Sequence, residues 1–143
     1  MLRSDMLRKR LLRVNETDRL PETAYQPEIT RQTYEILGRH AIRILSQGHS
    51  GIVDAVFANE TERSAIRDDA SKLGVRFAGL YLQTDLATRQ RRVGTRSRDA
   101  SDATPEIAAL QEKYEIGAID WTIIDASGTP EQTLERCRSA IAF

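Results

Sequence analysis

The sequence predicts one α/β domain, a three-layer fold in which helices cover both faces of a parallel sheet. Segments with helical periodicity alternate with short apolar runs, which are typical of strands buried on both faces. The chain has 143 residues, of which 40% are hydrophobic and 29% charged, enough for one core and too few for two ordinary domains. We therefore expect residues 1–143 to form a single parallel α/β domain.

The first half of the chain contains two predicted helices and the strand between them. Apolar residues at helical spacing predict a helix from about residue 28 to 46, and the apolar run 52–57 predicts a buried strand. Asn59 and Glu62 resemble an N-cap pair, and the helix that follows them is expected to end at Gly74.

The second half continues the alternation and includes one polar segment. Residues 94–104 have no apolar period and many small polar residues, so we expect a lid loop there. The predicted regular elements are a strand over 75–83, a helix over 86–93 after Asp85, a helix from Thr104–Pro105, a strand over 121–125, and a last helix from Thr129–Pro130.

Composition excludes several classes of protein. The 21 basic and 21 acidic residues balance, which argues against a protein that coats nucleic acid, and no apolar run approaches the roughly 20 residues of a membrane span. No apolar signal segment is indicated, so we expect a cytoplasmic protein. The single Cys137 and two histidines provide no zinc-ligand cluster, so any metal would be oxygen-bound magnesium.

Positive charge gathers in two clusters, which suit a compact anion such as a phosphorylated small molecule. The clusters are Arg3, Arg8, Lys9, Arg10 and Arg13, and then Arg89, Arg91, Arg92, Arg96 and Arg98.

The first candidate site is Arg3-Ser4-Asp5 followed by Arg8. In an open parallel sheet the ligand lies outside the carboxyl ends of the strands. If a strand ends near residue 4 and a helix starts near Asp5, then Asp5 and Arg8 share one helical face. Asp5 could then accept a proton from a substrate hydroxyl while Arg8 holds substrate or phosphate. The alternative is that Asp5 only interacts with the helix dipole beside a solvated basic face.

The second candidate is Asp54, a carboxylate inside an otherwise apolar run. An unpaired buried carboxylate costs several kcal/mol, so Asp54 is expected at the strand end, facing a cation or a hydrogen-bond donor. Such an acid can orient magnesium or its water shell. Capping of the following loop is the alternative.

The third candidate is the arginine-rich segment 89–98. Arginines in a loop can close over a polyphosphate and stabilise charge on the transferring phosphoryl group. A solvated helix is the alternative, although such helices normally mix signs. We expect Asp99 and Asp102 to hold the open loop by pairing with these arginines.

Four segments in order carry a family resemblance over essentially the whole chain. They are Leu-Arg-Ser-Asp-x-x-Arg-Lys, Gly-His-Ser-x-x-Val-Asp-Ala-Val-Phe, the arginine-rich segment running into Asp-Ala-Ser-Asp-Ala, and Asp-Trp-x-x-Ile-Asp-Ala-Ser-Gly. This order resembles the P-loop kinase-like ATP-binding domains, especially those fused behind aminoglycoside-phosphotransferase-like domains. Gluconate kinases and zeta toxins are wider relatives.

The resemblance implies ATP and Mg²⁺ as cofactors and a hydroxylated or phosphorylated metabolite as partner. It also implies a role for individual residues: Asp5 as base or substrate contact, Arg3 and Arg8 as substrate contacts, Asp54 as the magnesium-side acid, Arg92 and Arg96 as lid arginines, and Asp125, Gly128 and Pro130 in the loop near the adenine.

One motif of that family has no counterpart. No G-x-x-x-x-G-K-[ST] string occurs in the sequence, although this loop cradles phosphates in the family. The family's first, central strand precedes that loop and lies between the strands that correspond to 51–57 and 76–82. Without it, backbone groups of the two neighbouring strands lose their hydrogen-bond partners. We therefore expect either that these two strands close up on each other or that another segment fills the vacant strand position, for example through self-association.

Three functions are compatible with these observations. The first is transfer of a phosphoryl group from ATP to a small-molecule hydroxyl, in a domain that is incomplete and not expected to be active alone. The second is a non-catalytic relative that binds a phosphorylated ligand or a protein. The third, nucleic-acid binding, is disfavoured because no aromatic residue falls among the arginines.

Overall fold

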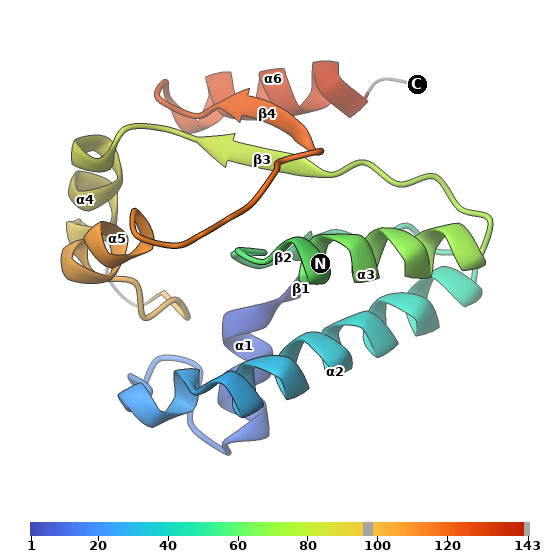
Figure 1. The fold of residues 1–143 in the computed structure, drawn as a ribbon, viewed down its shortest axis with the longest axis horizontal. Coiled ribbons are helices and arrows are strands. Elements are labelled where there is room, and N and C mark those ends of the chain that lie inside the picture. Colours follow the sequence, from blue (N-terminus) through green and yellow to red (C-terminus); the bar gives the residue numbers. More distant parts are fainter. Residues whose placement is uncertain (96–98, 142–143) are drawn as a thin grey trace. The chain divides into compact units, whose positions relative to one another are not determined.

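A computed structural model describes residues 1–95 and 99–141 of the chain. Helices alternate with short parallel strands, which confirms the predicted α/β class (Figure 1). The described residues form two compact units. One comprises residues 1–57, 64–76 and 99–102, and the other comprises 58–63, 77–95 and 103–141.

The first unit begins with a strand that leads directly into a helix. Strand β1 (Leu2–Arg3) is followed without a break by α1 (Ser4–Leu11), as the first candidate site requires. A short 3-10 helix, η1 (Glu22–Tyr25), precedes the long helix α2 (Pro27–Ser46), which packs on α1. The helix predicted over 28–46 is confirmed, and its proline occupies a first-turn position where no backbone donor is lost.

Strand β2 (Val53–Asp54) pairs in parallel with β1, with Leu2 opposite Val53 and Arg3 opposite Asp54. The strand is shorter than the predicted run over 52–57. The chain leaves the extended conformation at Phe57, whose φ is 46° and whose backbone N–H donates to the Tyr34 hydroxyl at 2.9 Å. The two rings also meet edge to face, with centroids 5.3 Å apart. The strand itself ends at Asp54, opposite Arg3, because its partner β1 ends there and α1 begins at Ser4.

Helix α3 (Glu60–Lys72) has the two predicted end signals. The backbone and side-chain amides of Asn59 donate to the Glu62 carboxylate at 3.3 and 3.2 Å. After the helix, Gly74 adopts a φ of 65°, a conformation that costs glycine little.

The second unit contains a parallel strand pair with a helix beside it (Figure 1). Strand β3 (Leu80–Gln83) pairs with β4 (Thr122–Asp125), and α6 (Pro130–Ile141) packs on β4. Strand β3 is shorter than the predicted run over 75–83. Its ladder begins with Leu80 opposite Thr122, the first residue of β4, and just before it the Trp121 ring occupies the space that a Cβ of residue 79 would need.

Two further helices of this unit start at predicted caps. The Asp85 carboxylate accepts from the backbone N–H of Thr88 at 2.8 Å and opens α4 (Leu86–Gly94). The Thr104 hydroxyl accepts from the backbone N–H of Ile107 at 3.3 Å and opens α5 (Pro105–Gln111). Caps depend on residues three apart, which is why the sequence predicts them well.

The strand pairs differ from the single sheet expected. Within the described ranges the strands form two two-stranded sheets, β1–β2 and β3–β4. Apolar residues at both pairs are open to solvent, because Ile52 is 67% exposed and Leu82 is 56% exposed. None of the helices described has the combination of length and apolar character that crossing a bilayer requires.

Arg63 is the largest fully buried side chain among the described residues. Its guanidinium donates to the carbonyl oxygens of Ala58 at 2.9 Å, Ile116 at 2.6 Å and Ala118 at 3.0 Å. The side chain therefore ties the start of α3 to the segment between α5 and β4.

Candidate functional site

Asp5 lies in the first turn of α1, directly after the carboxyl end of β1. Burial raises the pKa of its carboxyl group, while a hydrogen bond with Ser101 and the charge of Arg3 oppose that rise. A carboxylate with a raised pKa is a stronger base than an ordinary one. The location and the electrostatics both suit acceptance of a proton.

Arg3 lies between two carboxylates of the first unit. Its Nε is 3.3 Å from Asp54 Oδ2, and its Nη2 donates to Asp99 Oδ1 at 3.0 Å. The hydrogen bond to Asp99 is the main reason why the pKa of the Arg3 guanidinium is raised. Asp54 thus faces a cation at its strand end, as the sequence predicts.

Magnesium would have one carboxylate available at this strand end. The Asp54 side chain is 57% exposed, so its oxygens can accept from the water shell of an ion. Among the described residues, no three His, Cys, Asp or Glu side chains are placed to hold a metal ion by themselves. The residues present fit an ion held mainly by water and phosphate, with Asp54 as an outer partner.

Arg8 is buried and contacts the segment before α2. Its Nη1 donates to the Ala24 carbonyl at 2.8 Å and to the Thr30 hydroxyl at 3.2 Å. Its guanidinium carbon also lies 4.9 Å from the centroid of the Tyr25 ring. Arg8 therefore holds η1 and the first turn of α2 in place, and its predicted contact with substrate stays a prediction.

Sequence reasoning missed the network around Asp102. This carboxylate forms an ion pair with Lys9 Nζ at 3.0 Å, and it accepts from the Tyr25 hydroxyl at 2.8 Å and the Leu20 backbone N–H at 3.2 Å. Burial, followed by the hydrogen bond to Asp102, raises the pKa of the Tyr25 hydroxyl. The expectation that Asp102 pairs with the arginines of 89–98 is thus corrected, because its ionic partner is Lys9. The single lysine of the first basic cluster, Lys9, was the available signal.

Arg92, predicted as a lid arginine, contacts the loop after β4. Its guanidinium donates to the carbonyl oxygens of Ala126 at 2.6 Å, Ser127 at 3.3 Å and Gly128 at 2.5 Å. It therefore shapes the loop predicted to lie near the adenine. The other predicted lid arginine, Arg96, lies outside the described residues.

The three residues predicted near the adenine belong to one ordered loop of the second unit. Asp125 accepts from the Ser127 hydroxyl and from the Ser127 backbone N–H, the latter at 2.9 Å, and these two bonds, the hydroxyl first, lower the pKa of its carboxyl group. Gly128 follows, where an added Cβ would collide with the Gln132 side chain. Pro130 then opens α6.

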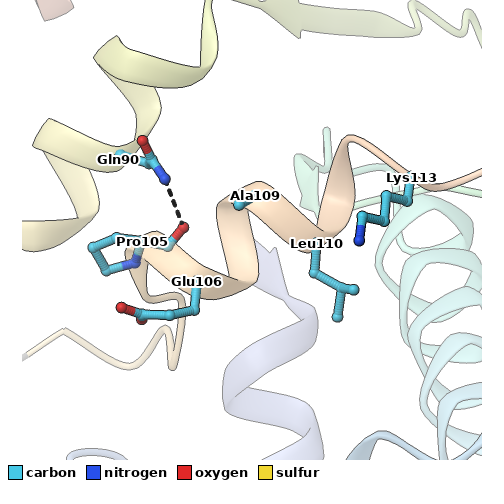
Figure 2. A pocket seen from close by; sticks show the side chains of 6 residues that line it. All are labelled: Gln90, Pro105, Glu106, Ala109, Leu110 and Lys113. Atoms are coloured by element: carbon cyan, nitrogen blue, oxygen red, sulfur yellow. Dashed lines mark hydrogen bonds between the residues drawn. The ribbon is translucent and has the colours of Figure 1, made fainter.

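A shallow hollow of about 370 Å³ lies in the second unit between α4 and α5 (Figure 2). A hydrogen bond of 3.3 Å from the Gln90 amide to the Pro105 carbonyl links the two helices there. The lining residues are Gln90, Pro105, Glu106, Ala109, Leu110 and Lys113. None of the predicted site residues belongs to this set.

Comparison with known proteins identifies the family. The model of the AAA domain family matches residues 1–115, which include Asp5, Asp54 and the network around Asp102. The match ends before β4, so the loop from Asp125 to Pro130 lies beyond it. No curated protein and no solved structure matches the chain. The chain belongs to the AAA domain family, whose members are P-loop NTPase-like, nucleotide-binding domains.

Proposed function

We propose that the chain provides the acceptor side of a kinase-like domain that transfers a phosphoryl group from ATP to the hydroxyl of a small molecule. The observation that supports this most is the position of Asp5, a half-buried carboxylate at the carboxyl end of a parallel strand. The order of the four quoted segments further supports a gluconate-kinase- or zeta-toxin-like branch, such as the domains fused behind aminoglycoside-phosphotransferase-like domains.

In this proposal Asp5 accepts the proton of the acceptor hydroxyl. The raised pKa of its carboxyl group favours that role, and the Arg3 guanidinium orients and balances the carboxylate charge. ATP with Mg²⁺ supplies the phosphoryl group when bound, and Asp54 would orient the water shell of the ion. Phosphoryl transfer depends mainly on positioning and on charge stabilisation, so few side chains need to react.

The nucleotide side of the proposal rests on the loop after β4. Arg92 fixes the backbone of residues 126–128, and α6 begins at Pro130 directly after the loop. No phosphate-cradling string occurs in the sequence, so contact with the terminal phosphates has to come from other residues. We therefore expect the chain by itself to bind ATP weakly.

Calorimetry with ATP and Mg²⁺ measures this expectation directly. Without backbone donors to cradle the phosphates, no sub-millimolar binding should be detected for the chain alone. A sub-millimolar dissociation constant would show that these residues hold the nucleotide without a Gly-rich loop.

The test of catalysis uses the chain joined behind a strand–G-x-x-x-x-G-K-S–helix segment, with ATP and a panel of polyhydroxylated metabolites. Asp5→Asn should reduce phosphorylation of the best acceptor about 10²-fold or more, the range that a general base contributes. Asp68→Asn, a change at an exposed carboxylate of α3, is the matched control and should leave the rate unchanged. Equal rates in the Asp5 and Asp68 variants would reject Asp5 as the base.

One observation favours a second candidate, a non-catalytic relative that keeps the fold and binds a ligand. Arg8 and Arg92, two arginines predicted to contact substrate or phosphate, both donate to backbone carbonyls. Their engagement reduces the positive charge available to a polyphosphate. Under this alternative the joined chain would bind acceptors without any ATP-dependent modification of them.

A further inference from the structure

Residues 99–102, which we name the strap, contact the rest of the first unit through three side chains in four residues. Asp99 accepts from Arg3 Nη2 at 3.0 Å, and Ser101 shares a hydrogen bond with the Asp5 carboxyl group. Asp102 Oδ1 forms an ion pair with Lys9 Nζ at 3.0 Å. The strap therefore lies on the carboxyl end of β1 and on α1, although about 90 residues separate them in the sequence.

Asp102 carries most of the polar contact of the strap. Its side chain is 9% exposed, and its ion-pair partner and two hydrogen-bond donors come from three places: α1, the segment before η1, and η1 itself. The Lys9 side chain is 1% exposed and has a second acceptor, the Glu16 carbonyl at 3.0 Å. A buried ion pair with satisfied hydrogen bonds is costly to break, because the remaining charge loses its partner.

We propose that the strap is a closing element over Arg3 and Asp5, that Asp102 is the positioning residue that holds it shut, and that an acceptor reaches Asp5 only when the strap lifts. The docking of the strap stands on the contacts themselves. The gating of an acceptor rests on the proposed function.

Because Asp102 holds three partners at once, we expect the strap to open in one cooperative step. When Asp102 leaves, Lys9 loses its only carboxylate partner among the described residues, and the Tyr25 hydroxyl and the Leu20 N–H lose their acceptor at once. The strap and the segment 20–25 should therefore loosen together. In the closed state Asp99 and Ser101 occupy donors and acceptors of Arg3 and Asp5 that an acceptor hydroxyl would need.

Lysine labelling tests the docking without nucleotide or acceptor. The sequence has three lysines, Lys9, Lys72 and Lys113, so each modified site is resolved by mass spectrometry after digestion. Lys72 has a 73% exposed side chain and serves as internal reference. In the unchanged chain an amine-acylating reagent should modify Lys9 at least about tenfold more slowly than Lys72, because a buried, paired ammonium is protected.

Asp102→Asn removes the charge while it nearly preserves the shape. We expect the labelling rate of Lys9 to rise about tenfold or more, with faster amide hydrogen exchange in 99–103 and 18–25 and an unchanged rate at Lys72. Asp68→Asn, at an exposed position of α3, should change none of these values. Tyr25→Phe removes one hydrogen bond to Asp102 and retains the ring, so it should raise Lys9 labelling by about threefold in a folded protein.

If Asp102→Asn does not fold, Lys9 labelling of Tyr25→Phe tests the docking role of Asp102. Unchanged Lys9 labelling in the folded variants, or faster exchange in only one of the two segments, would overturn the docking role of Asp102. The gating step has a separate readout in the joined chain: Asp102→Asn should lower KM for the acceptor, whereas Asp5→Asn should lower kcat. If Asp102→Asn alters Lys9 labelling but leaves KM for the acceptor unchanged, gating is rejected and the docking of the strap stands. If the joined chain transfers no phosphoryl group at all, the proposed function is rejected and the docking of the strap stands.

Discussion

Replacement of the buried Arg63 by alanine should destabilise the second unit strongly. The guanidinium donates to three carbonyl oxygens, those of Ala58, Ile116 and Ala118. Arg63→Ala removes all three donors and leaves a cavity where the side chain is now fully buried. The carbonyl of Ile116 has the shortest of the three bonds, at 2.6 Å, and should lose most.

The magnitude follows from the number of bonds and the freedom of the acceptors. A hydrogen bond from a charged group contributes about 1.5–3 kcal/mol, so three bonds set an upper range of roughly 5–9 kcal/mol. Ala118 is exposed, and the segment around it can turn its carbonyls toward water after the change. We therefore expect a loss of about 3 kcal/mol, a large part of the roughly 5–15 kcal/mol that stabilises a domain.

Urea unfolding followed by fluorescence measures this loss. Trp121 is the sole tryptophan of the sequence and belongs to the second unit, so its emission reports the affected region. With a slope near 1.5–2 kcal/mol per M, the midpoint should fall by about 1.5–2 M. Arg63→Lys keeps the charge but not the planar guanidinium, so its free energy of unfolding should lie between those of the unchanged chain and Arg63→Ala. Arg91→Ala, at an exposed position of α4, is the control and should have a free energy of unfolding within about 0.5 kcal/mol of the unchanged chain. A loss below about 1 kcal/mol in Arg63→Ala would refute the assignment of Arg63 as a clamp.

Three further predictions concern packing, capping and pH. Gly79→Ala places a Cβ against the Trp121 ring and should cost about 1–3 kcal/mol in urea unfolding. Gly51→Ala, whose Cβ would meet Ile44 at an ordinary van der Waals distance of 4.0 Å, should be close to neutral, and equal effects of the two changes would contradict the packing argument. Thr104→Ala removes the cap of α5 and should cost about 1 kcal/mol by the same measurement, with no loss counting against the cap. Burial raises the pKa of the Asp5 carboxyl group in the folded chain. The unfolded chain releases this proton above about pH 4, whereas the folded chain still holds it. The free energy of unfolding therefore falls as the pH rises from about 4 to the raised pKa of the folded state. Asp5→Asn should therefore be more stable than the unchanged chain at pH 7, with the difference vanishing below about pH 4 in parallel denaturation series; a variant that is less stable at pH 7 would contradict this sign.

Local signals explain what the sequence predicts well. The caps at Asp85 and Thr104 and the end of α3 at Gly74 each depend on residues within one helical turn, so the pattern is visible in the chain itself. The placement of Asp5 after a strand and in a first helical turn follows for the same reason. Strand lengths are less local, since β2 ends at Asp54, opposite the last residue of β1, Arg3, which lies about 50 residues earlier in the chain.

Partners across long stretches of chain explain what the sequence does not predict. Asp102 lies next to a run of arginines, yet its ionic partner is Lys9, because the fold returns residues 99–102 to α1. Arg92 likewise contacts carbonyls 34 to 36 residues away. A composition of basic residues indicates affinity for anions, but backbone carbonyls of the same chain compete for the same donors.

The pair of Arg3 and Asp54 has a consequence for folding specificity. Strands β1 and β2 contain two residues each, too few for an apolar pattern to select one register over its neighbours. A slip by one residue would turn Asp54 to the opposite face of the pair and leave the Arg3 guanidinium without that carboxylate. Because α1 starts at the residue after Arg3, the ion pair fixes the helix phase, and with it the direction in which the Asp5 carboxylate faces.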